Sequence, residues 1–94
     1  MTQSCTSTGV KTVDAVVSSA RCKLMSVHAT NASGSAFTVS VYDSGTATTS
    51  GKVEVARLYL ASNGSLEYDM HGRICAEGIY VDVTGTGTYS VEYS

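Results

Sequence analysis

The sequence is poor in charge, and it contains neither proline nor tryptophan. Only 15% of its 94 residues are Asp, Glu, Lys or Arg, and the formal net charge is -2. The six basic residues are scattered along the chain. Proteins that bind nucleic acid use clustered positive charge to replace the counterions on phosphates. We therefore expect no nucleic-acid partner.

Long apolar runs are also missing. The longest uncharged stretch with apolar content, residues 29–42, is interrupted by Ser, Thr and Asn. It falls far short of the roughly 20 apolar residues that a membrane helix needs. The first ten residues show neither the basic nor the apolar region of a secretory signal. These features predict no membrane partner and a protein that is made and kept in a cytosol, or released only when the cell breaks.

Cysteine is scarce and odd in number, at positions Cys5, Cys22 and Cys75. An odd count at wide spacing fits neither a disulfide framework nor a zinc-ligand pattern. We expect three reduced thiols, with Cys22 and Cys75 partly buried as small apolar groups.

Serine and threonine make up about a quarter of the chain, together with nine glycines. The most regular stretch is 78–93, where Ile79, Val81 and Val83 alternate with polar residues. Alternation places the aliphatic side chains on one face of a strand. The glycines of 85–87 favour a turn, so the stretch predicts a β-hairpin around which the remaining chain is organised.

Further short strands are expected upstream at spacings of about ten residues. Residues 22–30 and 36–43 predict a second hairpin, a strand is expected over 10–17, and 43–51 forms a surface loop. The alternation slips near Met25 and Ala56, which suggests bulges, and Gly72 is expected to end the strand before it. The pattern predicts an all-β fold, a single antiparallel β-sandwich of seven or eight short strands, jelly-roll-like. It would occupy residues 10–94, after a polar N-terminal arm at 1–9.

A nucleophilic site could be assembled from a cysteine, a histidine and an aspartate, the candidates being Cys22, Cys75, His28, His71, Asp69 and Asp82. No family signature surrounds either cysteine, and nothing in the sequence brings these residues together. Glu67, Asp69 and His71 share one face of a predicted strand and could hold zinc, but such a face is more often simply solvated. We expect no enzymatic activity, no metal and no cofactor.

Six tyrosines are the more informative residues. Tyr68, Tyr89 and Tyr93 share the phase of apolar neighbours and should lie in or beside the core, whereas Tyr42 and Tyr80 have the outward phase. Outward tyrosines either stabilise an exposed sheet through cross-strand contacts or anchor an interface, and the sequence leaves both open.

Taken together, the segments KLMSVHATNASGSAFTVSVYDS, ASNGSLEYDM and GIYVDVTGTGTYSVEY resemble the small β-sandwich virion proteins of tailed bacteriophages. That resemblance covers about residues 23–93 and implies a structural role. The expected function is capsid decoration that stabilises the head. Partners would be the major capsid protein or other virion proteins and copies of the chain itself. The protein would be assembled in the host cytoplasm and located in the virion.

Two alternatives stay open. One is a head-to-tail, tail or fibre component of the virion. The other is a carbohydrate-binding module that would use Tyr42 and Tyr80 as sugar platforms. The candidate interface residues are Thr2, Gln3 and Ser4, in an arm that would reach a neighbouring subunit, together with the two outward tyrosines.

Overall fold

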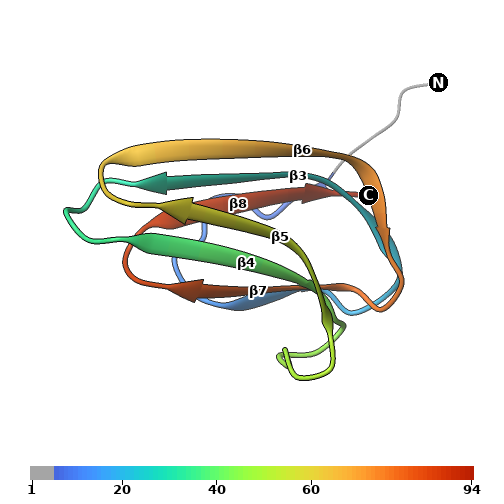
Figure 1. The fold of residues 1–94 in the computed structure, drawn as a ribbon. Helices are drawn as coiled ribbons and strands as arrows, with labels where there is room; N and C mark the ends of the chain where they lie inside the picture. Colours follow the sequence, from blue (N-terminus) through green and yellow to red (C-terminus); the bar gives the residue numbers. More distant parts are fainter. Residues whose placement is uncertain (1–5) are drawn as a thin grey trace.

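The computed structural model describes residues 6–94, which form eight strands in two four-stranded antiparallel sheets (Figure 1). The strands are β1 (Thr6–Ser7), β2 (Ala15–Ser18), β3 (Cys22–Asn31), β4 (Phe37–Asp43), β5 (Val53–Leu60), β6 (Gly64–Cys75), β7 (Ile79–Thr84) and β8 (Thr88–Tyr93). One sheet has the order β1-β8-β3-β6 and the other β2-β7-β4-β5. No helix within 6–94 has the length and apolar content to cross a membrane.

The strand order is that of a jelly roll. Strands pair as β1 with β8, β2 with β7, β3 with β6 and β4 with β5, as in a long antiparallel ribbon rolled into two layers. The predicted single antiparallel sandwich of jelly-roll type is therefore confirmed. Among the described strands, only β4 and β5 are both consecutive in sequence and paired.

Both predicted hairpins are wrong. Strand β7 pairs with β2 and β4, whereas β8 pairs with β1 and β3, so residues 78–93 cross from one sheet to the other. Residues 22–43 cross in the same way, because β3 and β4 belong to opposite sheets. Gly87 lies in the first of these connections, and a Cβ added there would be 2.4 Å from the ring of Phe37. This glycine is needed for the close passage over the core and not for a hairpin turn.

The predicted phase slips are bulges. The β3–β6 register shifts between Leu24 and Ser26, where one residue of β3, Met25, lies opposite the three residues 70–72 of β6. Two of those three have positive φ, His71 at 55° and Gly72 at 75°. Gly72 therefore bends β6 instead of ending it, and the strand continues to Cys75. The β4–β5 register shifts beside Ala56, where Val55 is the extra residue.

The core lies between the sheets and is built from the inward residues of both. Its largest members with a fully buried side chain are Phe37, Leu24, Leu58, Ile79 and Val27. Alternation along each strand supplies these inward residues, and each bulge shifts the register so that the apolar side chains after it again face the core.

The predicted strand at 10–17 is shorter than expected, since only Ala15–Ser18 forms β2 and Val10, Val13 and Val16 are exposed.

The N-terminal segment joins the sandwich from Thr6 onward. Thr6 pairs with Tyr93 and Ser7 with Glu92, and the Thr8 N–H donates to the Val91 carbonyl at 3.0 Å. This part of the predicted arm therefore adds a strand to its own chain and not to a neighbour.

The edge strand β6 is less well covered than its sequence suggested. Tyr68 has the inward phase, opposite Val27, yet it is 42% exposed, and Leu66 beside it is also exposed. The prediction that Tyr68 lies in or beside the core is wrong, because it is not among the side chains packed against the core cluster. Tyr89 is buried and Tyr93 packs against the core, as expected for both.

Candidate protein–protein interface on the outer face of one sheet

Tyr42 and Tyr80 lie directly opposite each other on the outer face of the β2-β7-β4-β5 sheet. Val41, which precedes Tyr42, and Val81, which follows Tyr80, are fully buried. Because successive side chains alternate between faces, both tyrosines point outward. The predicted outward face is thus confirmed for both tyrosines. The other candidate interface residues, Thr2, Gln3 and Ser4, lie outside the described residues.

Tyr80 is nonetheless only 7% exposed. It is flanked by its cross-strand neighbours Val16 and Tyr42. Its hydroxyl lies 3.4 Å from Oδ2 of Asp14. Burial raises the pKa of Tyr80, and the negative charges of Asp14 and Asp82 raise it further. The Tyr80 ring is therefore covered by its neighbours on the sheet, and it is not free to contact a ligand.

The same face carries two residues that the sequence argument did not single out. Tyr59 of β5 is 61% exposed and lies opposite Thr38. Arg57, two residues earlier, lies opposite Ser40, between Tyr59 and Tyr42 along the face. The alternation after the bulge at Val55 could have revealed both, since Ala56, Leu58 and Leu60 take the inward phase.

Arg57 is held in place by its neighbours. Its Nε donates to Oε2 of Glu54 at 3.0 Å, and the hydrogen bond and charge of Glu54 raise the pKa of the guanidinium, with a smaller contribution from Tyr42. An exposed ion pair of this kind contributes little stability but limits the orientations of the arginine. Tyr42, Arg57 and Tyr59 therefore form a continuous surface of two aromatic rings and one cation, here called the Tyr–Arg face.

The outer face of the opposite sheet has a different character. Its central part, on β3, β8 and β6, carries hydroxyl, imidazole and carboxylate groups, two pairs of which contact each other, and the exposed Ile74 lies near one end. Ser26 donates to Oε1 of Glu92 at 2.7 Å, and Nε2 of His28 lies 3.6 Å from Oε2 of Glu67. These contacts satisfy the polar groups locally, as on a solvated sheet face.

A second feature of the Tyr–Arg sheet is a pair of carboxylates near its β2–β7 edge. Oδ1 of Asp14 accepts the Val83 N–H at 2.8 Å. Burial raises the pKa of Asp82, and the charge and hydrogen bond of Asp14 raise it further. The two carboxylates therefore share a site in which one of them is more easily protonated than usual.

The residues considered for catalysis are not assembled into a site. Cys22 and Cys75 lie on the inner side of their sheet, whereas His28 lies on its outer face. His71 is on the exposed bulge, with Nδ1 3.5 Å from Oδ1 of Asp69. Asp82 belongs to the other sheet.

The residues considered for zinc are likewise divided. Glu67 pairs with His28, and Asp69 with His71. Within residues 6–94 no group of three or more His, Cys, Asp or Glu side chains is placed to hold a metal ion.

The larger concave regions lie at the two ends of the sandwich, and a small one of about 90 Å³ lies over β3 and β8 beside Val10 and His28. None of them includes a residue of the Tyr–Arg face. At one end, a region of about 420 Å³ is lined mainly by threonines and glycines of the connections around Thr30 and Thr86. At the other end, a region of about 290 Å³ is lined by Arg21, Cys22, Lys23, Ile74 and Ser94. Comparisons of this chain with protein-family models, with curated proteins and with solved structures found no match.

Proposed function

We propose that this protein is a structural, non-enzymatic accessory protein that binds a larger protein assembly through its Tyr–Arg face. The assembly we favour is the virion of a tailed phage, with the chain bound as a decoration protein on the outside of the head. The observation that carries the proposal is the contrast between the two sheet faces. One presents Tyr42, Arg57 and Tyr59, and the other presents polar side chains that pair with one another.

Tyrosine and arginine are the residues that most often dominate binding energy at protein interfaces. The tyrosine ring buries a large contact area and loses little conformational entropy on binding. The planar guanidinium group of arginine offers several hydrogen-bond donors. A flat sheet face suits a broad partner surface better than a small ligand, which needs a concave site. A subunit with one adhesive and one solvated face is suited to coating a shell.

The mechanism would be cementing. A protein that binds the mature shell more tightly than the immature or ruptured shell shifts the equilibrium toward the mature form. Its contribution grows with the ratio of its free concentration to its dissociation constant. No bond needs to be made or broken, which agrees with the dispersed catalytic candidates.

The carbohydrate-binding alternative loses one of its two supports. A sugar platform needs an exposed ring face, and Tyr80 is almost completely covered. A head-to-tail, tail or fibre component would use the same face and differs from decoration only in copy number.

Mass spectrometry of purified virus particles tests the proposed location. Hundreds of copies per particle would indicate decoration, and about a dozen or fewer would indicate a tail or vertex part. Absence from the particles would refute the virion assignment.

Point variants test the face itself. We expect Tyr59→Ala and Arg57→Ala to weaken binding to particles that lack the native protein by tenfold or more each, with little change in melting temperature, because both side chains are exposed. The matched control is His28→Ala, on the outer face of the other sheet. Equal binding by all three variants would contradict the proposed face.

A deletion that tests whether the N-terminal arm contacts a neighbouring subunit should stop before β1. Removing residues 2–9 would delete β1 and uncover the edge of β8, so a loss of assembly could simply reflect damage to the sheet. Removing residues 2–5 leaves β1 in place. We expect this variant to fold normally, and light scattering together with particle binding would show whether these residues contact a neighbour.

A further inference from the structure

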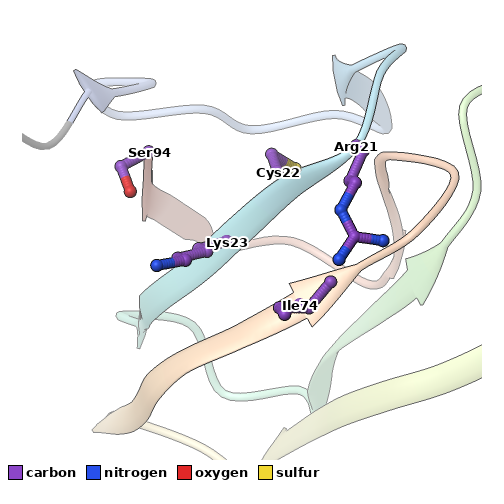
Figure 2. Close-up of a pocket in the computed structure, with 5 residues that line it drawn as sticks. All are labelled: Arg21, Cys22, Lys23, Ile74 and Ser94. Carbon is purple, nitrogen blue, oxygen red and sulfur yellow. The ribbon is translucent and has the colours of Figure 1, made fainter.

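Cys22 and Cys75 are directly opposite each other in the antiparallel pair β3–β6. Figure 2 shows Cys22 at the start of β3, and Ile74, the residue before Cys75, on the neighbouring β6. Both thiols are free, and both side chains belong to the inner side of the sheet, where Cys75 is fully buried and Cys22 packs against the core. The two cysteines are 53 positions apart in sequence (75 minus 22), so the fold alone brings them together.

The backbone hydrogen bonds define the geometry of this pair. Lys23 exchanges two bonds with Ser94, its N–H to the Ser94 carbonyl at 2.8 Å and its carbonyl from the Ser94 N–H at 2.9 Å. Because successive residues direct their backbone groups to opposite sides, those of Cys22 are directed toward β6. The Cys22–Cys75 pair is therefore of the hydrogen-bonded kind, with Cα atoms about 5.5 Å apart. Disulfides span Cα separations of about 4.4–6.8 Å, so the backbones are close enough. The Cβ atoms of such a pair are about 5.5 Å apart, and the bond requires them to approach to about 4 Å by a local shift of the two strand ends.

We propose that Cys22 and Cys75 form a cross-strand disulfide when the protein meets a small-molecule disulfide oxidant such as oxidised glutathione. The bond would clamp the start of β3 to the end of β6. This proposal does not depend on the structural role proposed above. It is compatible with reduced thiols in a cytosol, since the oxidant is encountered outside one.

Cys22 is the thiol that an oxidant can reach. It is partly exposed and lines the concave region of about 290 Å³ together with Arg21 and Lys23, whose side chains leave the backbone on the side opposite to its own (Figure 2). These two cations attract an anionic reagent such as glutathione to this end of the sandwich. Cys75 has no exposed surface and is reached only through Cys22.

The reaction proceeds in two exchange steps. The Cys22 thiolate attacks one sulfur of oxidised glutathione, the glutathione S–S bond breaks, and one glutathione thiolate leaves. Cys75 then loses its proton to solvent and attacks the Cys22 sulfur, which expels the second glutathione thiolate. Two protein thiols are oxidised to one disulfide, and one glutathione disulfide is reduced to two glutathione molecules.

The second step should be the slow one. Burial raises the pKa of Cys75 to about 11, with smaller contributions from the charges of Asp43 and Cys22. Only a small fraction of Cys75 is therefore thiolate at neutral pH. Closure should accelerate about tenfold for each unit by which the pH rises toward that pKa.

The clamp would act where the chain leaves one sheet for the other. The residue after Cys75, Ala76, donates its N–H to Oδ2 of Asp43 at 3.0 Å, and Ile79, four residues on, is already buried in the opposite sheet. A covalent bond at this end restricts the unfolded chain and opposes separation of β6 from β3.

The test compares full-length protein treated with oxidised or reduced glutathione. The Cys5→Ser variant removes the remaining thiol and is expected to behave like the unchanged chain. Trypsin cleavage after Arg21, Lys23 and Arg73, without reduction, should yield peptide 22–23 disulfide-linked to peptide 74–94. The intact mass should fall by two hydrogens.

Oxidation should also raise the melting temperature, by roughly 10 °C for a domain of this size. Cys22→Ser should abolish the linked peptide and the gain in melting temperature, and it should still fold because this side chain is only partly buried. A stable glutathione adduct on Cys22 without the linked peptide would overturn the proposal. A linked peptide accompanied by a lower melting temperature would overturn it as well, because the native pairing would then not accommodate the bond.

Discussion

The carboxylate of Asp43, at the end of β4, accepts a hydrogen bond at 2.8 Å from the backbone N–H of Glu77, in the connection that crosses from β6 to β7. The N–H groups of Ala76 and Gly78 bind the same carboxylate, at 3.0 and 3.3 Å. One side chain at the end of β4 thus satisfies three backbone donors of the β6–β7 connection. Because these donors have no strand partner, the carboxylate fixes the path of that connection.

Replacing this carboxylate should destabilise the protein. We expect Asp43→Ala to lower the free energy of unfolding by about 1–3 kcal/mol, because hydrogen bonds to a charged acceptor are lost and donors are left unpaired. The matched control is Asp69→Ala, which removes a single bond from the His71 N–H at 2.9 Å and should cost less. Urea denaturation at pH 7 measures both, and equal losses would show that the three-donor arrangement is unimportant.

The same carboxylate should contribute an acid-dependent part of the stability. Burial acts to raise the pKa of Asp43, but the three backbone N–H groups and Arg73 outweigh it, so the pKa is lowered from 3.8. A lowered pKa in the folded state means a contribution that is present above pH 3.8 and lost as the pH falls through the folded value. Denaturation curves of Asp43→Asn should therefore show a shallower loss of stability below pH 4 than those of the unchanged protein.

Neighbouring positions in β7 should respond in opposite ways. Val81 is fully buried, so Val81→Asp places a charge in the core without a partner and should prevent folding. Asp82 lies on the outer face, and burial, together with the charge and hydrogen bond of Asp14, raises its pKa, so its negative charge is unfavourable there. Asp82→Asn should therefore fold and be as stable as the unchanged protein, or more stable by a few tenths of a kcal/mol after solvent screening. Circular dichroism and thermal melts separate the two outcomes, and two equally stable variants would contradict the register.

Stability should fall in alkali because of Tyr89. Its hydroxyl donates to the Val13 carbonyl at 2.7 Å, and burial raises its pKa to about 12, with smaller effects from Asp14 and Tyr80. The folded protein therefore keeps the proton that the unfolded chain releases near pH 10, and stability declines between pH 10 and 12 by about 2–3 kcal/mol. Tyr89→Phe should lose about 1 kcal/mol at pH 7 and show a smaller decline in alkali, measured by denaturation across this range.

Gly78 should not tolerate a side chain. Its φ is 146°, and an added Cβ would lie 2.2 Å from the Ser18 carbonyl oxygen and 2.9 Å from the Cα of Gly45. Backbone atoms cannot move aside as a flexible side chain can, so we expect Gly78→Ala to prevent stable folding. Gly34→Ala is the control, because nothing lies within 4 Å of a Cβ there. Comparable melting temperatures for the two variants would refute this account of the turn.

The sequence by itself determined which side of the regularly alternating strands faces the core. Alternation placed Val81 inside and Tyr42 and Tyr80 outside, and the interruptions of alternation near Met25 and Ala56 located two bulges. These properties are local, because the direction of a side chain in a strand depends on its own position and on the two-residue period.

Only the tertiary structure decided which strands pair. The Gly–Thr connection at 85–87 is compatible with a hairpin and with a connection that crosses between the sheets. Its glycines do not indicate that Phe37 lies against them. The exposure of Tyr68, the covering of Tyr80 and the meeting of Cys22 with Cys75 depend on the partner strand in the same way. Pairing between residues far apart in sequence depends on how the apolar surfaces of all strands are buried together. The sequence of a single strand therefore does not specify its partner.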